Sequence, residues 1–502
     1  MRKNLDICFF IVFCIAVAIV CAFTAYHFFT PAKPGAAVIS SLFALMSIFV
    51  CAVAGFIYFK YEKLSIQKIF AIFFILFGLL YAFIIPMFGN NDEPNHWRRI
   101  LQIKEGHIFA DVSAENPSQL GGFLPSNAVP RIRGISDLFI KLDFENRQWN
   151  EFSNTAAYFP ISYIFQMPGI IAVSLFSKMT FLQAYTGRLS SLFFSFILCL
   201  FMIKQIPFKK KTLFALFSTP VFLQQSAALC ADISIILTAF LISVFVIICY
   251  QDEFKQISKK HLALFAVLSL SISLVKTVYL PIMLLFLAIP FSKHKKTKNF
   301  IVFFAALFIV CLFLALTWTI GAGAFYTQDN FSRSYALSHS VYAIYLLARN
   351  LIFTIPETIY ETFGGAIAFG VSGQSSFSPI LAFVYAFYFI VLILCDDFYK
   401  PNKLLSAFSA VIIIAVSFAV TAAILIGGDF FKIVFERGYL GMHARYLYPI
   451  AFLAVLLISG IYKIHLNIDK EIVFKNFLLL AAFMHLAVFS SVIIFFSKYL
   501  LI

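Results

Sequence analysis

The chain has 502 residues, of which 62% are hydrophobic and only 12% charged, with 38 Lys and Arg against 23 Asp and Glu. Apolar runs of about 20 residues, the length that a helix needs to cross a bilayer, recur from end to end and exclude a soluble globular protein. The net charge of +15 does not indicate nucleic-acid binding, because most Lys and Arg lie in short loops between apolar runs.

The N-terminus and the cysteines carry no separate function. The opening "MRKNLDICFFIVFCIAVAIVCAF" begins like a signal peptide, but its apolar region is too long, and we expect an uncleaved first span. The nine cysteines lie in or beside apolar runs without metal-ligand spacing, which is typical of small buried hydrophobes.

The positive-inside rule predicts the first part of the path through the membrane. Three spans, near 7–29, 35–59 and 67–88, precede a long polar segment, 89–155, which falls outside. The next apolar piece, 156–178, is interrupted by two prolines and a glycine. If it crossed fully, the lysine cluster that follows would lie outside. We therefore predict a re-entrant or interfacial segment. Irregular backbone of this kind is tolerated in a membrane protein only where it is shielded by protein or faces a cavity.

The rest of the chain alternates between apolar runs and loops. The further predicted spans fall near 184–203, 212–229, 233–250, 261–275, 277–291, 300–320, 379–395, 404–426, 445–462 and 474–497. The prediction is an all-α polytopic membrane protein with about 13 transmembrane helices and an outer C-terminus. It is a single unit, 1–502, made of three N-terminal spans (1–88), an outer loop with the re-entrant segment (89–183) and the remaining bundle (184–502). A second large outer loop covers 321–378.

The stretch "GNNDEPNHWRRI", residues 89–100, places an unusual density of charge where the third span ends. A helix starting near Asp92 tolerates Pro94, because the first turn needs no N–H there. Its apolar stripe comprises Trp97, Ile100, Leu101 and Ile108, while Asp92, His96, Arg99 and Ile103 share another face. We expect this helix to lie along the outer membrane surface with Trp97 at the level of the headgroups.

Two interpretations of Asp92 are open. It caps the helix by accepting first-turn N–H groups and complements the helix dipole, with Arg98 and Arg99 touching lipid phosphates. Alternatively, it is a carboxylate at the membrane edge that acts as general base on an acceptor hydroxyl, with cations nearby to hold an anionic leaving group.

Six pieces of sequence, taken in order, carry a family resemblance. They are "NDEPNHWRRILQIKEGHIF", "GGFLP" (121–125), "YFPISYIFQMPG" (158–169), "SAALCADISI" (226–235), "LVKTVYLPIMLL" (274–285) and "GMHARYLYP" (441–449). The acidic pair after an early span resembles the signature of C-type glycosyltransferases, polytopic enzymes that take a sugar from a polyprenyl-phosphate carrier at the outer membrane face. More closely, the chain resembles the bacterial group catalogued as domain of unknown function 2142.

The resemblance implies roles for three acidic residues. Asp92 corresponds to the catalytic base, with Glu93 beside it as a second carboxylate, and Asp232 matches an acid at the outer end of a later span. The predicted topology also puts Asp232 at the outer face, where its alternative role is a helix cap. Lys276 lies between two short apolar runs at the same face and suits a carrier phosphate, or else is a snorkelling lysine.

The start of the span at 445–462 adds three candidates. Arg445 offers bidentate contact to a phosphate, or else anchors the topology, and His443 and Tyr446 flank it. Asp92, Asp232, Lys276 and Arg445 are far apart in the sequence, yet all are predicted at one depth on one side.

Weaker substrate-binding candidates complete the predicted site. These are His96, Arg99, Tyr158 with its neighbour Pro160, and Arg188, which sits near the outer start of a span. Glu357 and Glu361 in "PETIYETFGG" lie one helical turn apart and suggest a metal or acceptor role. His96 alone is equally consistent with a structural histidine. The sequence has neither a Walker loop nor a paired-glycine fingerprint, which argues against a nucleotide-sugar donor or an ATP-driven pump.

We therefore expect an inverting membrane glycosyltransferase that moves a sugar from a polyprenyl-phosphate carrier to a cell-surface glycan or lipid-linked acceptor. It would work at the outer face of the bacterial cytoplasmic membrane, with a flippase and a carrier-charging synthase as further partners. The alternatives are a flippase or transporter, which would carry charges at mid-membrane, and a polymerase or ligase for lipid-linked glycans. The cofactor is open; paired acids suit Mg²⁺ or Mn²⁺, but no ligand spacing requires either.

Overall fold

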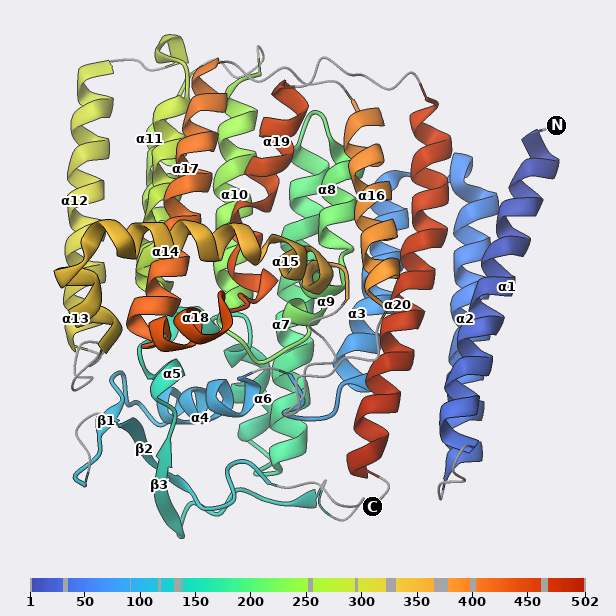
Figure 1. Ribbon diagram of the computed structural model, residues 1–502, viewed down its shortest axis with the longest axis horizontal. Coiled ribbons are helices and arrows are strands. Elements are labelled where there is room, and N and C mark those ends of the chain that lie inside the picture. Colours follow the sequence, from blue (N-terminus) through green and yellow to red (C-terminus); the bar gives the residue numbers. More distant parts are fainter. Residues whose placement is uncertain are drawn as a thin grey trace.

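A computed structural model shows a helical bundle with a small β-sheet at one end (Figure 1). The structure describes residues 2–29, 35–90, 92–115, 119–130, 137, 139–251, 256–293, 297–321, 331–364, 378–397, 403–461 and 468–500.

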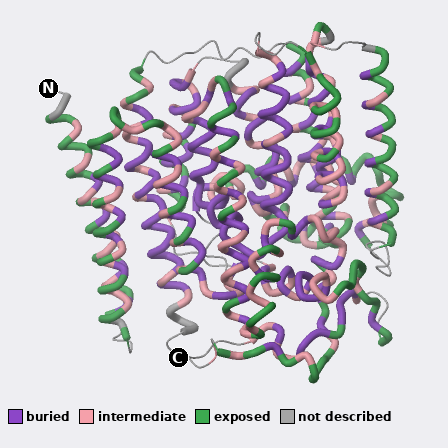
Figure 2. Tube along the Cα trace, turned by 180° about the vertical axis from the view of Figure 1, so that it is seen from behind, coloured by how far each residue is buried: buried purple, intermediate pink, exposed green. Residues whose placement is uncertain are grey.

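Eight helices among the described residues are long and apolar enough to cross a membrane. They are α1 (Arg2–Phe29), α2 (Ala36–Lys60), α3 (Ile66–Ile84), α7 (Thr180–Gln205), α10 (Asp232–Cys249), α12 (Thr297–Gly321), α17 (Lys403–Ala422) and α20 (Lys470–Leu500). Each falls on a predicted span, so the chain is a mainly helical membrane protein. Buried residues concentrate in the middle of the bundle, whereas α1 and α2 are largely exposed (Figure 2).

The other five predicted spans are shorter or broken. Their elements are α8 (Lys210–Phe217) with α9 (Pro220–Ser226), α11 (Lys259–Val275), η4 (Thr277–Ala288), α16 (Pro379–Cys395), and η8 (Ala444–Tyr446), η9 (Tyr448–Ile450) and α19 (Ala451–Ile461). Prolines account for part of this, because Pro220 opens a new helix, Pro281 lies inside η4 and Pro449 lies in the short η9. By length and composition, the described residues therefore provide eight crossing helices and not 13.

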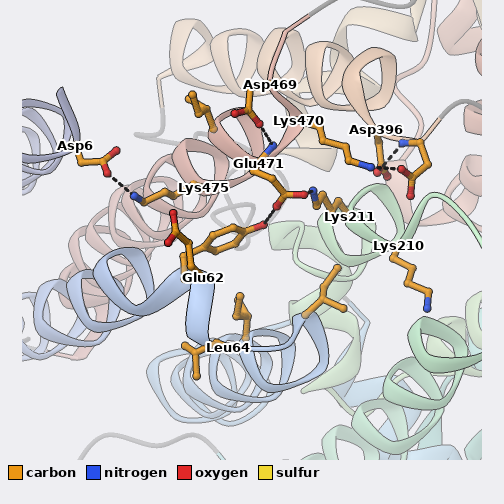
Figure 3. A pocket seen from close by; sticks show the side chains of 15 residues that line it. Asp6, Glu62, Leu64, Lys210, Lys211, Asp396, Asp469, Lys470, Glu471 and Lys475 are labelled. Carbon is orange, nitrogen blue, oxygen red and sulfur yellow. Dashed lines mark hydrogen bonds and ion pairs between the residues drawn. The ribbon is translucent and has the colours of Figure 1, made fainter. Parts of the chain in front are cut away.

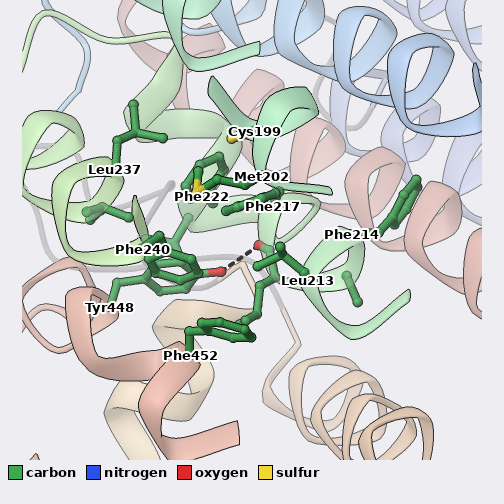
Figure 4. Close-up of a cluster of buried hydrophobic side chains, with 14 of the residues drawn as sticks. Cys199, Met202, Leu213, Phe214, Phe217, Phe222, Leu237, Phe240, Tyr448 and Phe452 are labelled. Atoms are coloured by element: carbon green, nitrogen blue, oxygen red, sulfur yellow. Dashed lines mark hydrogen bonds between the residues drawn. The ribbon is translucent and has the colours of Figure 1, made fainter. Parts of the chain in front are cut away.

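The break between α8 and α9 is closed by a tyrosine from the far end of the sequence. The Tyr448 hydroxyl lies 2.6 Å from the carbonyl oxygen of Leu216, to which it donates, and 2.7 Å from the Thr219 hydroxyl. Aromatic side chains including Phe222 and Phe240 pack around it (Figure 4). A carbonyl freed by a helix break inside a membrane protein needs such a partner, so the broken segment is stable without continuous helix.

The predicted outer loop 321–378 contains helices that the sequence analysis did not predict. They are α13 (Phe331–Ser338), α14 (Ser340–Phe353) and α15 (Ile355–Thr362). In Figure 1, α14 runs across the bundle, roughly perpendicular to the long helices. The short elements η1 (Tyr61–Lys63), η5 (Phe291–Lys293), the π-helical turn η7 (Ala423–Gly427) and α18 (Phe431–Arg437) complete the helical part.

The predicted outer loop after the third span contains a small sheet, which departs from the all-α prediction. Its strands β1 (Asp111–Val112), β2 (Leu120–Pro125) and β3 (Arg147–Glu151) are antiparallel in the order β1-β2-β3. The "GGFLP" stretch forms β2. A Cβ added at Gly121 would lie 2.1 Å from the Asn150 carbonyl oxygen, so the close approach of β3 requires glycine there.

The segment 156–178 contains only short helices. After α5 (Ser153–Ala156) come η3 (Pro160–Tyr163) and α6 (Met167–Ser174), which packs on α7. Eight helical residues span about 12 Å, far less than the hydrocarbon thickness of about 30 Å. Helices α8 and α9 are equally short on a predicted span, so it stays a prediction that 156–178 does not cross.

Helix α4 (Glu93–Lys104) lies inside the protein and not on the membrane surface, which corrects the prediction. The apolar side chains of Trp97, Ile100 and Leu101 are fully buried, and the Trp97 indole donates to the carbonyl of Ala128. The cause is the sheet and the short helices α5 and α6, which cover the helix face that the sequence left for lipid.

The end of the bundle opposite α4 and the sheet gathers lysines and acids around the first turns of α20. Lys475 pairs with Asp6 of α1 at 2.7 Å, and Lys211 pairs with Glu471 (Figure 3). These residues line a cavity of about 900 Å³. We call this the lysine end, and the end with α4 the site end. The positive-inside rule places the basic loops near 251–261, 291–298, 395–403 and 463–475 in the cytoplasm, and parts of these loops lie outside the described residues.

Candidate functional site

Asp92 precedes α4 in a left-handed backbone conformation, with φ of 59°. Its side chain makes no capping hydrogen bond to the helix. Instead, one carboxylate oxygen accepts from the Asn154 amide at 3.0 Å and the other from the Arg445 guanidinium at 2.6 Å. The structure therefore contradicts the interpretation of Asp92 as a side-chain cap. Aspartate is among the non-glycine residues most often found with positive φ, so the turn suits this residue.

Arg445 joins Asp92 to a second carboxylate. Its Nε lies 3.3 Å from Oδ2 of Asp232, the first residue of α10. The Arg445 and Asp232 side chains expose only 5% and 3% of their surfaces. Since a buried charge is tolerated only when paired, each of these groups needs the other. Three segments far apart in the sequence thus meet at one guanidinium, as the prediction of a common depth requires.

Lys276 lies between α11 and η4 among aromatic rings. Its Nζ is 4.3 Å from the centroid of the Tyr446 ring and donates to the Tyr158 hydroxyl at 3.3 Å. Tyr279 holds this wall in place by donating to the carbonyl of Tyr446. Within the described part of the chain, no carboxylate lies within ion-pair distance of Lys276. We call Asp92, Asp232, Lys276 and Arg445 the charged cluster.

His96 lies beneath the charged cluster. Its ring is buried, with Nδ1 2.9 Å from the Tyr163 hydroxyl, and it packs against Tyr158. Burial lowers the pKa of His96 to about 4, although the nearby carboxylate of Asp232 acts in the opposite direction. At neutral pH the ring is therefore uncharged and serves as a hydrogen-bonding part of the wall.

Electrostatics keep Asp92 ionised. Burial on its own raises the pKa of the carboxyl, but the adjacent Arg445 outweighs burial, and His96 and His443 act in the same direction as Arg445. The pKa therefore lies below its usual value. At neutral pH Asp92 is a carboxylate able to accept a proton.

Glu93 points away from the charged cluster, although it is the next residue. Both of its carboxylate oxygens accept from the Arg188 guanidinium, at 2.8 and 2.5 Å, and both side chains are fully buried. Arg188 also donates to the carbonyls of Ala82, Ile85 and Pro86 at the end of α3. The structure thus does not bring Glu93 and Arg188, two predicted site residues, to the cluster. Their pair fixes the start of α4 against α3 and α7.

Arg99 is likewise fully buried. It donates to the Gln102 side chain at 2.6 Å and to the carbonyls of Ile108 and Tyr158 at 2.5 and 3.3 Å. A guanidinium used in this way holds the Tyr158 backbone in position and is not presented to a ligand.

Glu361 belongs to the site, although the sequence indicated it only weakly. One oxygen is 3.2 Å from Nδ1 of His443, and the other accepts from the backbone N–H of Ala444 at 2.7 Å. Its signal was the one-turn spacing from Glu357, which suggested metal binding. Among the described residues, no group of three or more His, Cys, Asp or Glu side chains is arranged to hold a metal ion.

The fold and the contacts define a polytopic helical membrane protein whose described residues bring the charged cluster together at the site end. The model of the family described as "Predicted membrane protein (DUF2142)" matches residues 141–454, and the chain belongs to this family. The match includes Asp232, Lys276 and Arg445, while Asp92 precedes it and joins them by contact. No curated protein and no solved structure matched the chain.

Proposed function

We propose that this protein is an inverting glycosyltransferase that moves a sugar from a polyprenyl-phosphate carrier to a hydroxyl acceptor. The observation that carries the proposal is the Asp92 carboxylate, which is offered to Arg445 at 2.6 Å and is not used to cap its own helix. A base beside cations, at the end of a membrane bundle, is the arrangement that transfer from an anionic lipid requires.

The cations suit the leaving phosphate. Arg445 has donors for a bidentate contact, and Lys276 supplies a point charge with no carboxylate of the described chain within ion-pair distance. A phosphate bound between them would compete with Asp92 for Arg445. Donor binding would then release the carboxylate for the acceptor, which links the two halves of the reaction.

The reaction is a single displacement. The acceptor oxygen attacks the anomeric carbon while Asp92 takes the hydroxyl proton, and a new glycosidic bond forms with inverted configuration. The bond from the anomeric carbon to the phosphate oxygen breaks, and its electron pair stays with the phosphate monoester. Because the phosphate is already a good leaving group that Lys276 and Arg445 stabilise, no second carboxylic acid is needed to protonate it.

Cells with and without the gene test the proposal. A deletion strain complemented with wild type or with the Asp92→Asn variant would be compared by mass spectrometry of its lipid-linked and surface glycans. A missing sugar that only the wild type restores, together with accumulation of the donor lipid, supports transfer. Unchanged glycans in the deletion strain contradict the proposal. If the donor lipid accumulates on the other side of the membrane while the enzyme-dependent glycosidic bond still forms, a flippase is favoured.

Replacing Lys276 with alanine should weaken use of the lipid carrier by about ten- to a hundredfold, since a charge-assisted contact contributes about 1.5–3 kcal/mol. Initial rates at varied donor concentration, in proteoliposomes, measure the effect. Lys104→Ala is a suitable control, because that lysine contacts Gln183 at 3.0 Å and lies outside the charged cluster. Normal donor use by well-folded Lys276→Ala protein would remove the residue from the site.

The pH dependence should report the pairing of Asp92 with Arg445. Transfer needs the ionised carboxylate, so the rate falls as pH drops through the pKa of Asp92, which lies below its usual value. In the Arg445→Gln variant the main lowering cause is gone and burial remains, so the acid limb should move to higher pH. If the acid limb of the pH–rate profile stays at the same pH in the residual activity of Arg445→Gln, the ionisation of Asp92 does not control the rate.

The orientation of the bundle is a further prediction. The lysine end should face the cytoplasm and the site end the outside. Cysteines introduced at the exposed positions Phe123 and Lys204 report the two ends. In intact cells an impermeant thiol reagent should label Phe123→Cys but label Lys204→Cys only after permeabilisation, relative to the parent protein. The reverse pattern would place Asp92 on the cytoplasmic side.

A further inference from the structure

Solvent reaches the charged groups of the site unequally. The side chains of Asp232 and Arg445 expose 3% and 5% of their surfaces, whereas those of Asp92 and His443 expose 37% and 40%. A molecule that arrives from solvent therefore meets Asp92 and His443 before it meets Arg445. We call the two more exposed groups, Asp92 and His443, the mouth of the site, and the buried Arg445 guanidinium its interior.

His443 is held at this mouth by a buried carboxylate. Glu361 exposes 3% of its side chain and accepts from two groups at once, Nδ1 of His443 and the backbone N–H of Ala444. The bond at Nδ1 orients the ring, and the edge of the ring packs near Tyr446. An imidazole that donates its Nδ1–H to a carboxylate leaves Nε2 as an acceptor.

The backbone beside His443 is also adapted to α15. A Cβ added at Gly441 would lie 2.3 Å from the Glu357 carboxylate, so the chain passes close to the end of that side chain. Helix α15 thus contacts the 441–444 segment at two points, but only Glu361 bonds the imidazole. Glu357 can therefore serve as a matched control for Glu361 on the same helix.

We propose that His443, oriented by Glu361, binds a hydroxyl of the acceptor at the mouth of the site. An acceptor hydroxyl has one proton, and in the proposed reaction Asp92 takes it. His443 Nε2 then accepts a hydrogen bond from a neighbouring hydroxyl of the same molecule. The acceptor class is therefore a sugar or polyol with adjacent hydroxyls, and not a lone lipid alcohol. This inference rests on the proposed function, and Glu361 is a positioning residue in it.

Spectroscopy of the ring tests the orientation without any transfer reaction. The full chain, labelled with ¹⁵N-histidine in lipid nanodiscs, should show His443 protonated at Nδ1 and not at Nε2, with the signal assigned by its loss in His443→Gln. Glu361→Gln should change this pattern, since an amide has one acceptor oxygen for two donors, while Glu357→Gln should not. An unchanged pattern in Glu361→Gln would overturn the positioning role.

Added probes test what binds at the mouth. Methyl glucoside should shift the His443 Nε2 signal, whereas 1-propanol should not, and a shift with decaprenyl phosphate alone would assign His443 to the donor side and overturn the proposal. In the complemented strain, His443→Gln should reduce transfer about five- to tenfold, the effect of one lost hydrogen bond. If methyl glucoside shifts the signal but the glycans do not depend on the gene, the proposed function fails and the polyol site remains.

Discussion

The Asp92→Asn variant should fold normally and lose transfer by about 10²-fold or more. Asparagine keeps the shape of the side chain and accepts the left-handed backbone at least as readily as aspartate. No capping bond is lost, because the Asp92 side chain makes none to α4. What disappears is the negative charge, and with it the ion pair with Arg445 and the ability to take a proton at neutral pH. Initial rates of transfer, measured at equal amounts of folded protein, give the effect.

Asn154→Ala is the matched control for this variant. Asn154 is exposed and donates to the carboxylate oxygen of Asp92 that does not face Arg445. Removing it tests whether any disturbance around Asp92 is enough to stop the reaction, and we expect a change of only a few fold. Full activity of Asp92→Asn would refute the general base, and equal losses in both variants would point to loop geometry and not to proton transfer.

Part of the site was predictable because it depends on topology. The positive-inside rule put Asp232, Lys276 and Arg445 at one end of the bundle, and in the structure they meet there. Charges are costly in a membrane protein, so their positions relative to the apolar runs carry strong information. The same rule indicates that 156–178 does not cross, which stays a prediction.

The direction of a side chain was not predictable in the same way. Asp92 and Glu93 are adjacent, and composition gives them the same chemistry, yet one faces Arg445 and the other Arg188. The positive φ at Asp92, which the sequence does not reveal, separates them.

Three members of the predicted apolar stripe, Trp97, Ile100 and Leu101, are buried on α4, whereas the fourth, Ile108, lies beyond the end of the helix and is exposed. Hydrophobicity does not distinguish lipid from a covering sheet. None of the strands shows a period of two, because β1 has two residues, β2 is apolar without alternation and β3 is mostly polar.

The Glu93–Arg188 pair, finally, should matter for folding more than for chemistry. In Glu93→Gln the Arg188 guanidinium keeps its three carbonyl partners but loses its counter-charge in a fully buried place. Breaking such a pair typically destabilises a protein by about 3–5 kcal/mol. We expect a markedly lower thermal midpoint and poor recovery from the membrane, with transfer per folded molecule close to that of wild type.

Glu105→Gln, at the other end of α4, is the control for Glu93→Gln. It shows whether the effect comes from the loss of a buried counter-charge or from replacing any glutamate of this region by glutamine. Glu105 pairs with Arg147 at 2.8 Å, and the arginine side chain there is 36% exposed. Exposed pairs contribute about 0–1 kcal/mol, so Glu105→Gln should leave the thermal midpoint nearly unchanged. The thermal midpoints of both variants and of the wild type, measured in detergent, are compared. A stable Glu93→Gln protein that binds donor but does not transfer would return Glu93 to the catalytic role that its position beside Asp92 first suggested.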